Sequence, residues 1–283
     1  MRRIEHRITR PSTPQCGFTL IELVMVIVIM GVIGATVAVF IRKPVDAYFD
    51  TARRAALTDI ADTAVRRMAR DIAQALPNSI RQAGNQCIEF IPTRTGGRYR
   101  AAPDSGVAGD QSAAVLDFTQ ADSSFNMIGN SSAWPADQQI QAGDMVAVYN
   151  LGISGADAYA GDNTAVVTGV VPAAETTISI AAKQFPLASG SNRFQVIPGS
   201  EKIVSFVCSG GKLLRSANHA YANSCPTSGA TVSVLATNVA NCNFVYNASD
   251  LQRNALVQMT IALTDSGGET VSLYHEVHVN NTP

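Results

Sequence analysis

The sequence predicts an α+β protein in which a long N-terminal helix packs on an antiparallel β-sheet head. Three observations support this fold class. Residues 18–41 form an apolar run with a single charged side chain. A helical repeat of apolar residues then continues to Leu76. After Gly84, short segments rich in Val, Ile and Thr alternate with clusters of Gly, Ser, Asn and Asp, as strands alternate with turns.

The apolar run is long enough to cross a membrane. At ~1.5 Å rise per residue it covers about 36 Å of helix, more than the ~30 Å hydrocarbon core of a bilayer. Its one charge, Glu22, is costly in lipid and indicates a functional site with a partner elsewhere. Four arginines precede the run and only Arg42 and Lys43 follow it. The positive-inside rule therefore predicts a cytoplasmic N-terminus and an exported C-terminal part.

Beyond the run, the helix is expected to continue in amphipathic form. Pro44 should kink it without ending it, because proline removes only one backbone donor. Apolar residues then recur at three- and four-residue steps along one face: Leu57, Ile60, Ala61, Ala64, Val65, Met68, Ile72 and Leu76. Arg66, Arg67 and Arg70 lie on the other face, which we interpret as solvated in preference to a partner surface. Pro77 ends the helix. The predicted divisions are 18–43 for the membrane and assembly helix, 44–78 for its amphipathic half and 79–283 for the head.

The head is predicted to consist of short strands, and residues 97–112 and 119–143 are predicted to be surface loops. The predicted strands are 87–91, 114–118, 145–151, 165–171, 177–181, 193–197, 202–208, 212–215, 231–235, 242–246, 256–263 and 271–279. The last two are the clearest pair, because apolar and polar residues alternate on both sides of a turn at 265–268, as in a half-buried antiparallel hairpin.

The segment Gly17-Phe18-Thr19-Leu20-Ile21-Glu22-Leu23-Val24, after a basic leader, resembles the class III signal of type IV pilins and pseudopilins. The resemblance implies a pilin-like fold, a leader peptide at 1–17, cleavage between Gly17 and Phe18 by prepilin peptidase, and N-methylation of Phe18. It also implies that Glu22 pairs with the α-amino group of Phe18 on a neighbouring subunit. The alternatives fit less well, since a secretory signal has an apolar region of only ~7–15 residues and a plain anchor needs no Glu22.

Scattered stretches beyond the N-terminus narrow this resemblance. Residues 62–81, 87–93, 97–100 and 148–152 are similar to the O-type minor pilin of the mannose-sensitive haemagglutinin (MSHA) pilus system. That similarity implies a low-abundance subunit that helps initiate or cap the fibre. Its expected partners are the prepilin peptidase and methylase, major and other minor pilins through the N-terminal helix, and the inner-membrane assembly platform. Two alternatives stay open: a J-class minor pseudopilin of type II secretion, and an adhesin or ligand-binding subunit on a pilin stalk.

The location that these features imply changes with assembly. The resemblance predicts a single-pass inner-membrane protein before assembly and a periplasmic or pilus-borne subunit afterwards. Cys16 leaves with the leader, and four cysteines remain in an oxidising compartment, which indicates two disulfides. Of the three possible pairings we favour Cys208–Cys225, which closes a short loop around a hairpin, with Cys87–Cys242, which ties the first strand after the helix to a late one.

The sequence predicts no enzyme, cofactor or metal site. It lacks the phosphate loop G-x-x-x-x-G-K-[ST], the elbow G-x-S-x-G and the metal helix H-E-x-x-H. His275 and His278 would point to opposite faces of a strand, and His219 lacks the C-x₂-C spacing of a zinc site. Residues 155–163 hold enough oxygen ligands for calcium, but turns use the same residues. Without its leader, which carries a net +3, the chain carries −4, so nucleic acid is not an expected partner.

Overall fold

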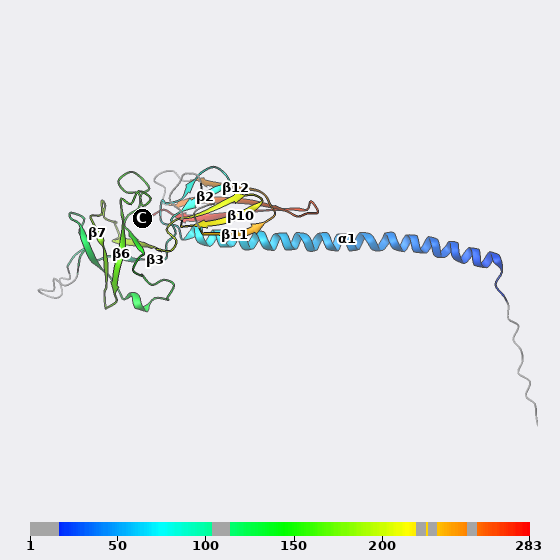
Figure 1. Cartoon of the computed structure of the whole chain (residues 1–283), viewed down its shortest axis with the longest axis horizontal. Helices are drawn as coiled ribbons and strands as arrows, with labels where there is room; N and C mark the ends of the chain where they lie inside the picture. Colours follow the sequence, from blue (N-terminus) through cyan, green and yellow to red (C-terminus); the bar gives the residue numbers. More distant parts are fainter. Residues whose placement is uncertain (1–16, 104–113, 219–224, 226–230, 248–253) are drawn as a thin grey trace, which may run out of the picture. The chain divides into compact units, whose positions relative to one another are not determined.

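A computed structural model describes residues 17–103, 114–218, 225, 231–247 and 254–283. Within these residues it contains the long helix α1 (Leu20–Ala73), the short 3-10 helix η1 (Ser131–Ala133) and fourteen strands (Figure 1). The strands are β1 (Arg81–Gln82), β2 (Cys87–Phe90), β3 (Thr95–Arg98), β4 (Asp122–Met127), β5 (Met145–Ala147), β6 (Thr164–Val171), β7 (Thr176–Lys183), β8 (Arg193–Ile197), β9 (Val204–Ser209), β10 (Lys212–Ala217), β11 (Thr231–Thr237), β12 (Val239–Asn247), β13 (Asn254–Thr264) and β14 (Thr270–Asn280). The chain forms two compact units, Met1–Ala52 and Arg53–Pro283. The predicted α+β, pilin-like fold class is confirmed.

Helix α1 continues through Pro44 and ends at Ala73, three residues before the predicted end at Leu76. It stops there because the backbone N–H of Leu76 donates to the carbonyl of Ile91 (2.8 Å) instead of extending the helical ladder. The predicted apolar stripe is buried at Leu57, Ala61, Ala64, Val65, Met68 and Ile72. Ile60 was wrongly included, since 40% of its surface is exposed. At about 100° per residue, Ile60 lies roughly 90° from the centre of the buried stripe.

Two antiparallel sheets cover the buried stripe of α1. One has the strand order β1-β2-β9-β10-β11 and the other the order β12-β13-β14. Figure 1 shows β10 and β11 lying beside the C-terminal part of the helix. The alternating inward residues of β13, among them Val257, Met259 and Ile261, share one core with Met68 and Ile72. The β13–β14 pair confirms the predicted hairpin, with Leu263 opposite Val271.

A glutamine side chain joins the two sheets where β1 meets β12. The side-chain nitrogen of Gln82 donates to the carbonyl of Phe244 (2.8 Å), and its Oε1 accepts from the backbone N–H of Tyr246 (2.9 Å). The Gln82 amide therefore takes the place of a neighbouring strand for β12. It gives hydrogen-bond partners to backbone groups of β12 that would lack them at a free sheet edge. Beside it, the backbone N–H of Phe244 donates to the carbonyl of Asn85 (2.7 Å).

Strands β3 to β8 form a separate lobe inserted between β2 and β9. Strands β2 and β9 pair directly, with Cys87 opposite Val207, so the intervening strands leave the main sheets and return. The inserted sheet has the order β3-β8-β5-β6-β7-β4. A bridge between Tyr99 and Met127 joins its two ends, supported by a hydrogen bond from the N–H of Ile128 to the carbonyl of Arg98 (2.9 Å). We call this insertion the barrel lobe. Its interior is a second hydrophobic core, with Phe125, Phe185 and Phe194 fully buried.

The barrel lobe contains the main differences from the predicted strands. Strand β4 lies within the predicted loop 119–143, and β3 overlaps the predicted loop 97–112. Both carry polar or glycine-rich sequences, and their pairing partners, not their own propensity, make them strands. Residues 114–118 form no strand. This segment nevertheless packs on the lobe, since the N–H of Leu116 donates to the carbonyl of Arg100 and the buried Leu116 side chain belongs to the lobe's hydrophobic core.

The barrel lobe is fixed to the main sheets by polar contacts just after α1. The side-chain nitrogen of Asn78 donates to the carbonyl of Asn150 (2.9 Å), and the side-chain nitrogen of Asn150 donates to the carbonyl of Pro77 (2.7 Å). Arg81 forms an ion pair with Asp157 (2.6 Å) and lies 3.9 Å from the ring centroid of Tyr159. These contacts join residues about 70–80 positions apart, so the insertion is docked on the head.

Glu89, on β2 directly opposite Arg81, is buried near this contact. Burial raises the pKa of Glu89 from 4.5 to about 7, against the opposing effects of Arg81 and Tyr159. The folded protein then binds more protons than the unfolded chain between about pH 4.5 and 7. Its free energy of unfolding should therefore fall as the pH rises through this window.

We expect the melting temperature of the wild type to drop between pH 5 and pH 8 more than that of Glu89→Gln, because glutamine does not titrate. The variant should also melt higher than the wild type at pH 8. Comparing the two proteins cancels the contribution of histidines, which both retain. Thermal unfolding followed by circular dichroism measures this, and parallel curves for the two proteins would show that Glu89 is not the titrating group.

Candidate functional site: the N-terminal assembly segment

The N-terminal end of α1 is organised by Thr19 and Glu22. Carboxylate oxygen Oε2 of Glu22 accepts hydrogen bonds from both the backbone N–H and the hydroxyl of Thr19, each at 2.9 Å. The N–H of Glu22 in turn donates to the Thr19 hydroxyl at 3.4 Å. This is a capping box, in which residues three positions apart satisfy backbone donors that the first turn of a helix leaves free.

The capping box gives Thr19 a role that was not predicted from the sequence. Its signal was present as threonine followed three residues later by glutamate, directly before an apolar run. The box holds the Glu22 carboxylate against the N-terminal turn, where the helix dipole favours negative charge. Gly17 and Phe18 precede the helix, and 88% of the Phe18 surface is exposed. The segment thus presents an accessible Gly17–Phe18 bond and a carboxylate held one turn further on.

The first part of α1 exposes a nearly continuous apolar surface. Every residue from Leu20 to Ile41 is exposed in the single chain, including Ile27, Ile33 and Phe40. By length and composition, α1 is able to cross a membrane. Apolar residues on all sides of a helix require lipid or neighbouring helices around them. Glu22 is the only acidic or basic residue among them.

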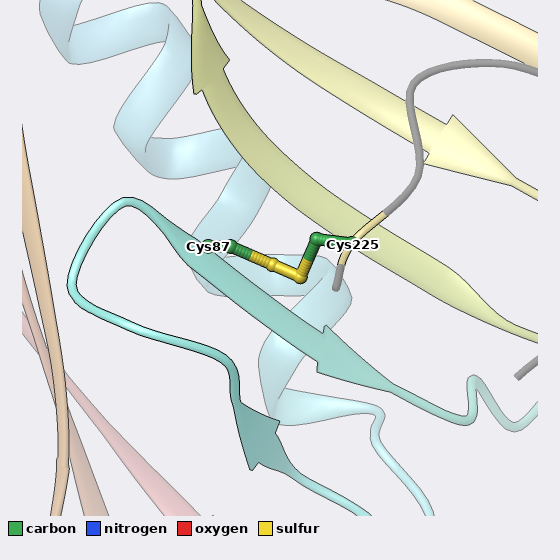
Figure 2. The surroundings of a disulfide bond; sticks show 2 residues. All are labelled: Cys87 and Cys225. Atoms are coloured by element: carbon green, nitrogen blue, oxygen red, sulfur yellow. A yellow bond between two sulfur atoms is a disulfide. The ribbon is translucent and has the colours of Figure 1, made fainter. Parts of the chain in front are cut away.

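Two disulfides form in the head, which confirms the predicted oxidation, but the predicted pairing is wrong. The bonds join Cys87 with Cys225, shown in Figure 2, and Cys208 with Cys242. Their Cα atoms lie 6.2 and 6.5 Å apart, within the usual range for a disulfide. The predicted bonds were Cys208–Cys225 and Cys87–Cys242.

The alternation of side chains along β9 explains the observed pairing. Cys87 on β2 lies opposite Val207 on β9, so these two side chains share a face of the sheet. Cys208 follows Val207 and points to the other face, where it packs on the helix-facing core together with Cys242. Cys87, Val207 and Cys225 form a small cluster of their own. Cys87 and Cys225 therefore meet on one face of the sheet, and Cys208 and Cys242 meet on the other.

The other residues that could have formed a site lie apart or are already engaged. Among the described residues there is no group of three or more His, Cys, Asp or Glu able to hold a metal ion. His275 is half-buried on one face of β14, and His278 is exposed on the opposite face. Asp157 pairs with Arg81, and Asp162 accepts from the N–H of Gly155 (3.0 Å). His219 lies outside the described residues.

The arginines on the outer face of α1 are exposed, as predicted. Arg66, Arg67 and Arg70 all lie on the solvent side of the helix, opposite its buried stripe. Arg66 forms an ion pair with Asp62 at 2.6 Å, one helical turn earlier. An exposed pair of this spacing is a common feature of a solvated helix face and contributes little to stability.

A comparison with known protein families matches residues 13–38 to the prokaryotic N-terminal methylation motif. The matched range contains the Gly17–Phe18 bond, the capping box and most of the exposed apolar part of α1. Neither the curated proteins nor the solved structures compared with this chain contain a match.

Proposed function

We propose that this type IV pilin-like protein, which carries the N-terminal methylation motif of the pilin and pseudopilin superfamily, is a minor pilin of an MSHA-like pilus. In this role it helps initiate or cap the fibre after prepilin peptidase has cut between Gly17 and Phe18. The motif implies processing by that peptidase, and it implies that the protein is a structural subunit and not an enzyme. Together with the apolar helix, it indicates an inner-membrane anchor. The observation that carries the proposal is Glu22, a lone carboxylate on an otherwise apolar, fully exposed helical segment.

The geometry of the N-terminal turn supports an assembly role for Glu22. A carboxylate in lipid requires a partner of opposite charge, because an isolated ion loses its hydration. Thr19 supplies hydrogen bonds but no charge. The α-amino group of Phe18 that processing creates on a neighbouring subunit would supply the positive charge. Such a pair would set the axial register of adjacent helices, since any sliding of one past the other would leave both charges buried and unpaired.

The barrel lobe supports a specialised position for the subunit. It is inserted between two directly paired strands and has a hydrophobic core of its own, so it adds a second folded module without altering the main sheets. A module of this size suits a subunit present in few copies, at the fibre tip, better than one repeated along a shaft. The same observation favours a second candidate function, a ligand-binding subunit borne on a pilin stalk.

Replacing Glu22 by alanine should prevent assembly without preventing membrane insertion. The variant makes the segment more apolar, so the membrane fraction should contain as much protein as for the wild type. Its incorporation into sheared fibres, measured by quantitative immunoblot, should fall at least about tenfold. Mass spectrometry should show a mature N-terminus at N-methylated Phe18 in the wild type.

Thr19→Val is the matched control. It removes the hydroxyl of the capping box but retains the carboxylate, so incorporation should fall much less than with Glu22→Ala. If Glu22→Ala subunits enter fibres as well as the wild type does, the charge-pairing role is excluded. A mature N-terminus beyond residue 30 would instead contradict the processing site.

A further inference from the structure

Two arginines face each other on the outside of the barrel lobe. Arg98 on β3 and Arg193 on β8 occupy directly opposite positions of the antiparallel ladder. Both are exposed, whereas the residues beside them, Tyr99 and Phe194, point into the lobe and are buried. In the described part of the chain, neither Arg98 nor Arg193 has an acidic partner within 4.0 Å.

This arrangement is unfavourable for the protein alone, because like charges directly opposite each other on neighbouring strands repel. The positive charges of two nearby arginines in the same segment are balanced by acidic partners. Arg94 forms an ion pair with Asp144 at 3.0 Å, and Arg100 forms one with Glu175. In the sequence Arg98 lies between these two ion-paired arginines, but in the sheet it lies opposite the positive charge of Arg193. An anion bound between the two guanidinium groups would remove the repulsion.

The two arginines border a hollow of about 370 Å³ at the edge of the lobe. Gly96 and Gly97 supply part of its lining without side chains. A Cβ atom on Gly96 would lie 2.8 Å from the carbonyl oxygen of Phe194, and one on Gly97 would lie 2.7 Å from the sulfur of Met127. Larger residues are therefore excluded at both positions. Gly97 faces the core, whereas Gly96 lies on the same exposed face as Arg98, so the backbone of β3 stays uncovered there.

Gln195 adds a second polar feature to the same hollow. It lies two residues after Arg193 and therefore on the same face of β8. Its side-chain oxygen is buried and accepts no hydrogen bond from any described residue. A buried acceptor without a donor costs free energy that a ligand hydroxyl or N–H group would recover. An anion without a hydrogen-bond donor could not satisfy the Gln195 oxygen, because the anion and the amide oxygen both accept hydrogen bonds.

We propose that this hollow binds an acidic saccharide through one hexuronate unit. The carboxylate of the sugar lies between Arg98 and Arg193, whose planar guanidinium groups donate paired hydrogen bonds to it. A ring hydroxyl donates to the side-chain oxygen of Gln195, and the sugar ring lies over Gly96 of β3. The volume matches the lower range of small-ligand sites. This binding activity does not depend on the proposed role in fibre assembly.

The test measures binding of trigalacturonic acid to the full chain in non-ionic detergent by isothermal titration calorimetry. We expect saturable binding that weakens at least about tenfold with Arg98→Gln, Arg193→Gln or Gln195→Leu. The α-1,4-linked galactose trimer, which has the same ring hydroxyl configuration but a hydroxymethyl group in place of each carboxylate, should not bind. Arg70→Gln, which removes an exposed arginine from α1, should bind as the wild type does.

Two further measurements separate a binding site from a structural defect. Without ligand, Arg98→Gln and Arg193→Gln should melt at or above the wild-type temperature, because each relieves the repulsion. Trigalacturonic acid should raise the melting temperature of the wild type but not of these variants. Absence of binding, equal binding by the three site variants, or equally tight binding of inorganic phosphate would overturn the proposal of an acidic-saccharide site.

Discussion

Replacing Met68 by aspartate should strongly destabilise the head at neutral pH. Met68 is fully buried on the inner stripe of α1 and belongs to the core that both main sheets share. An ionised carboxylate there has no partner, and large losses of more than about 4 kcal/mol follow from burying an unpaired charge. Since whole domains are stable by only about 5–15 kcal/mol, this one change removes much of the total.

The measurement is thermal unfolding of a soluble fragment, residues 45–283, followed by circular dichroism. Without the membrane half of α1, this fragment should be soluble, with mixed helix and strand signals. Met68→Asp should lower its melting temperature by at least about 10 °C, given roughly 2–4 °C per kcal/mol for a domain of this size. An unchanged melting temperature would mean that the stripe faces solvent or another subunit.

Ile60→Asp is the matched control, because it places the same charge on the same helix two turns earlier. Ile60 is 40% exposed and lies beside the buried stripe. Its carboxylate can remain hydrated, so the free energy of unfolding should change by no more than about 0.5 kcal/mol. A large effect at Ile60 and none at Met68 would reverse the assignment of the two faces.

Removing the Cys208–Cys242 disulfide should produce the other large loss of stability. This bond closes a loop between residues 34 positions apart and connects the two main sheets through β9 and β12. In the chain-entropy model such a loop contributes about 4 kcal/mol. The double variant Cys208→Ala, Cys242→Ala should therefore unfold at a clearly lower denaturant concentration than the wild type under non-reducing conditions.

Peptide mapping tests the pairing itself. Non-reduced digests of the wild type should contain Cys87 linked to Cys225 and Cys208 linked to Cys242. In the double alanine variant the Cys87–Cys225 link should remain, because that pair lies on the opposite face of the sheet. A link between Cys208 and Cys225 in the wild type would support the pairing predicted from the sequence. It would contradict the placement of these two cysteines on opposite faces of the sheet.

Features encoded by neighbouring residues were predictable from the sequence. The apolar run, the lone Glu22 and the buried stripe of α1 depend on helical spacing. The structure places the stripe as predicted except at Ile60, which is exposed, and at Leu76, which lies beyond the end of the helix in another hydrophobic cluster. The β13–β14 hairpin was also predictable, because its alternation and its turn are contiguous in the chain. The family comparison covers the same N-terminal region, residues 13–38.

Only the tertiary structure decided which distant segments pair. The sequence does not mark the barrel lobe as a separate unit, since strands such as β6 and β7 are rich in Val, Ile and Thr like those of the main sheets. Polar segments such as β3 and β4 become strands because they pair with β8 and β7. These partners are distant in the chain, so the local sequence does not reveal the pairing. The cysteine pairing and the opposition of Arg98 to Arg193 depend on strand register for the same reason. Local periodicity determines which face a residue takes on its own strand, but contacts between strands are set by packing of the whole chain.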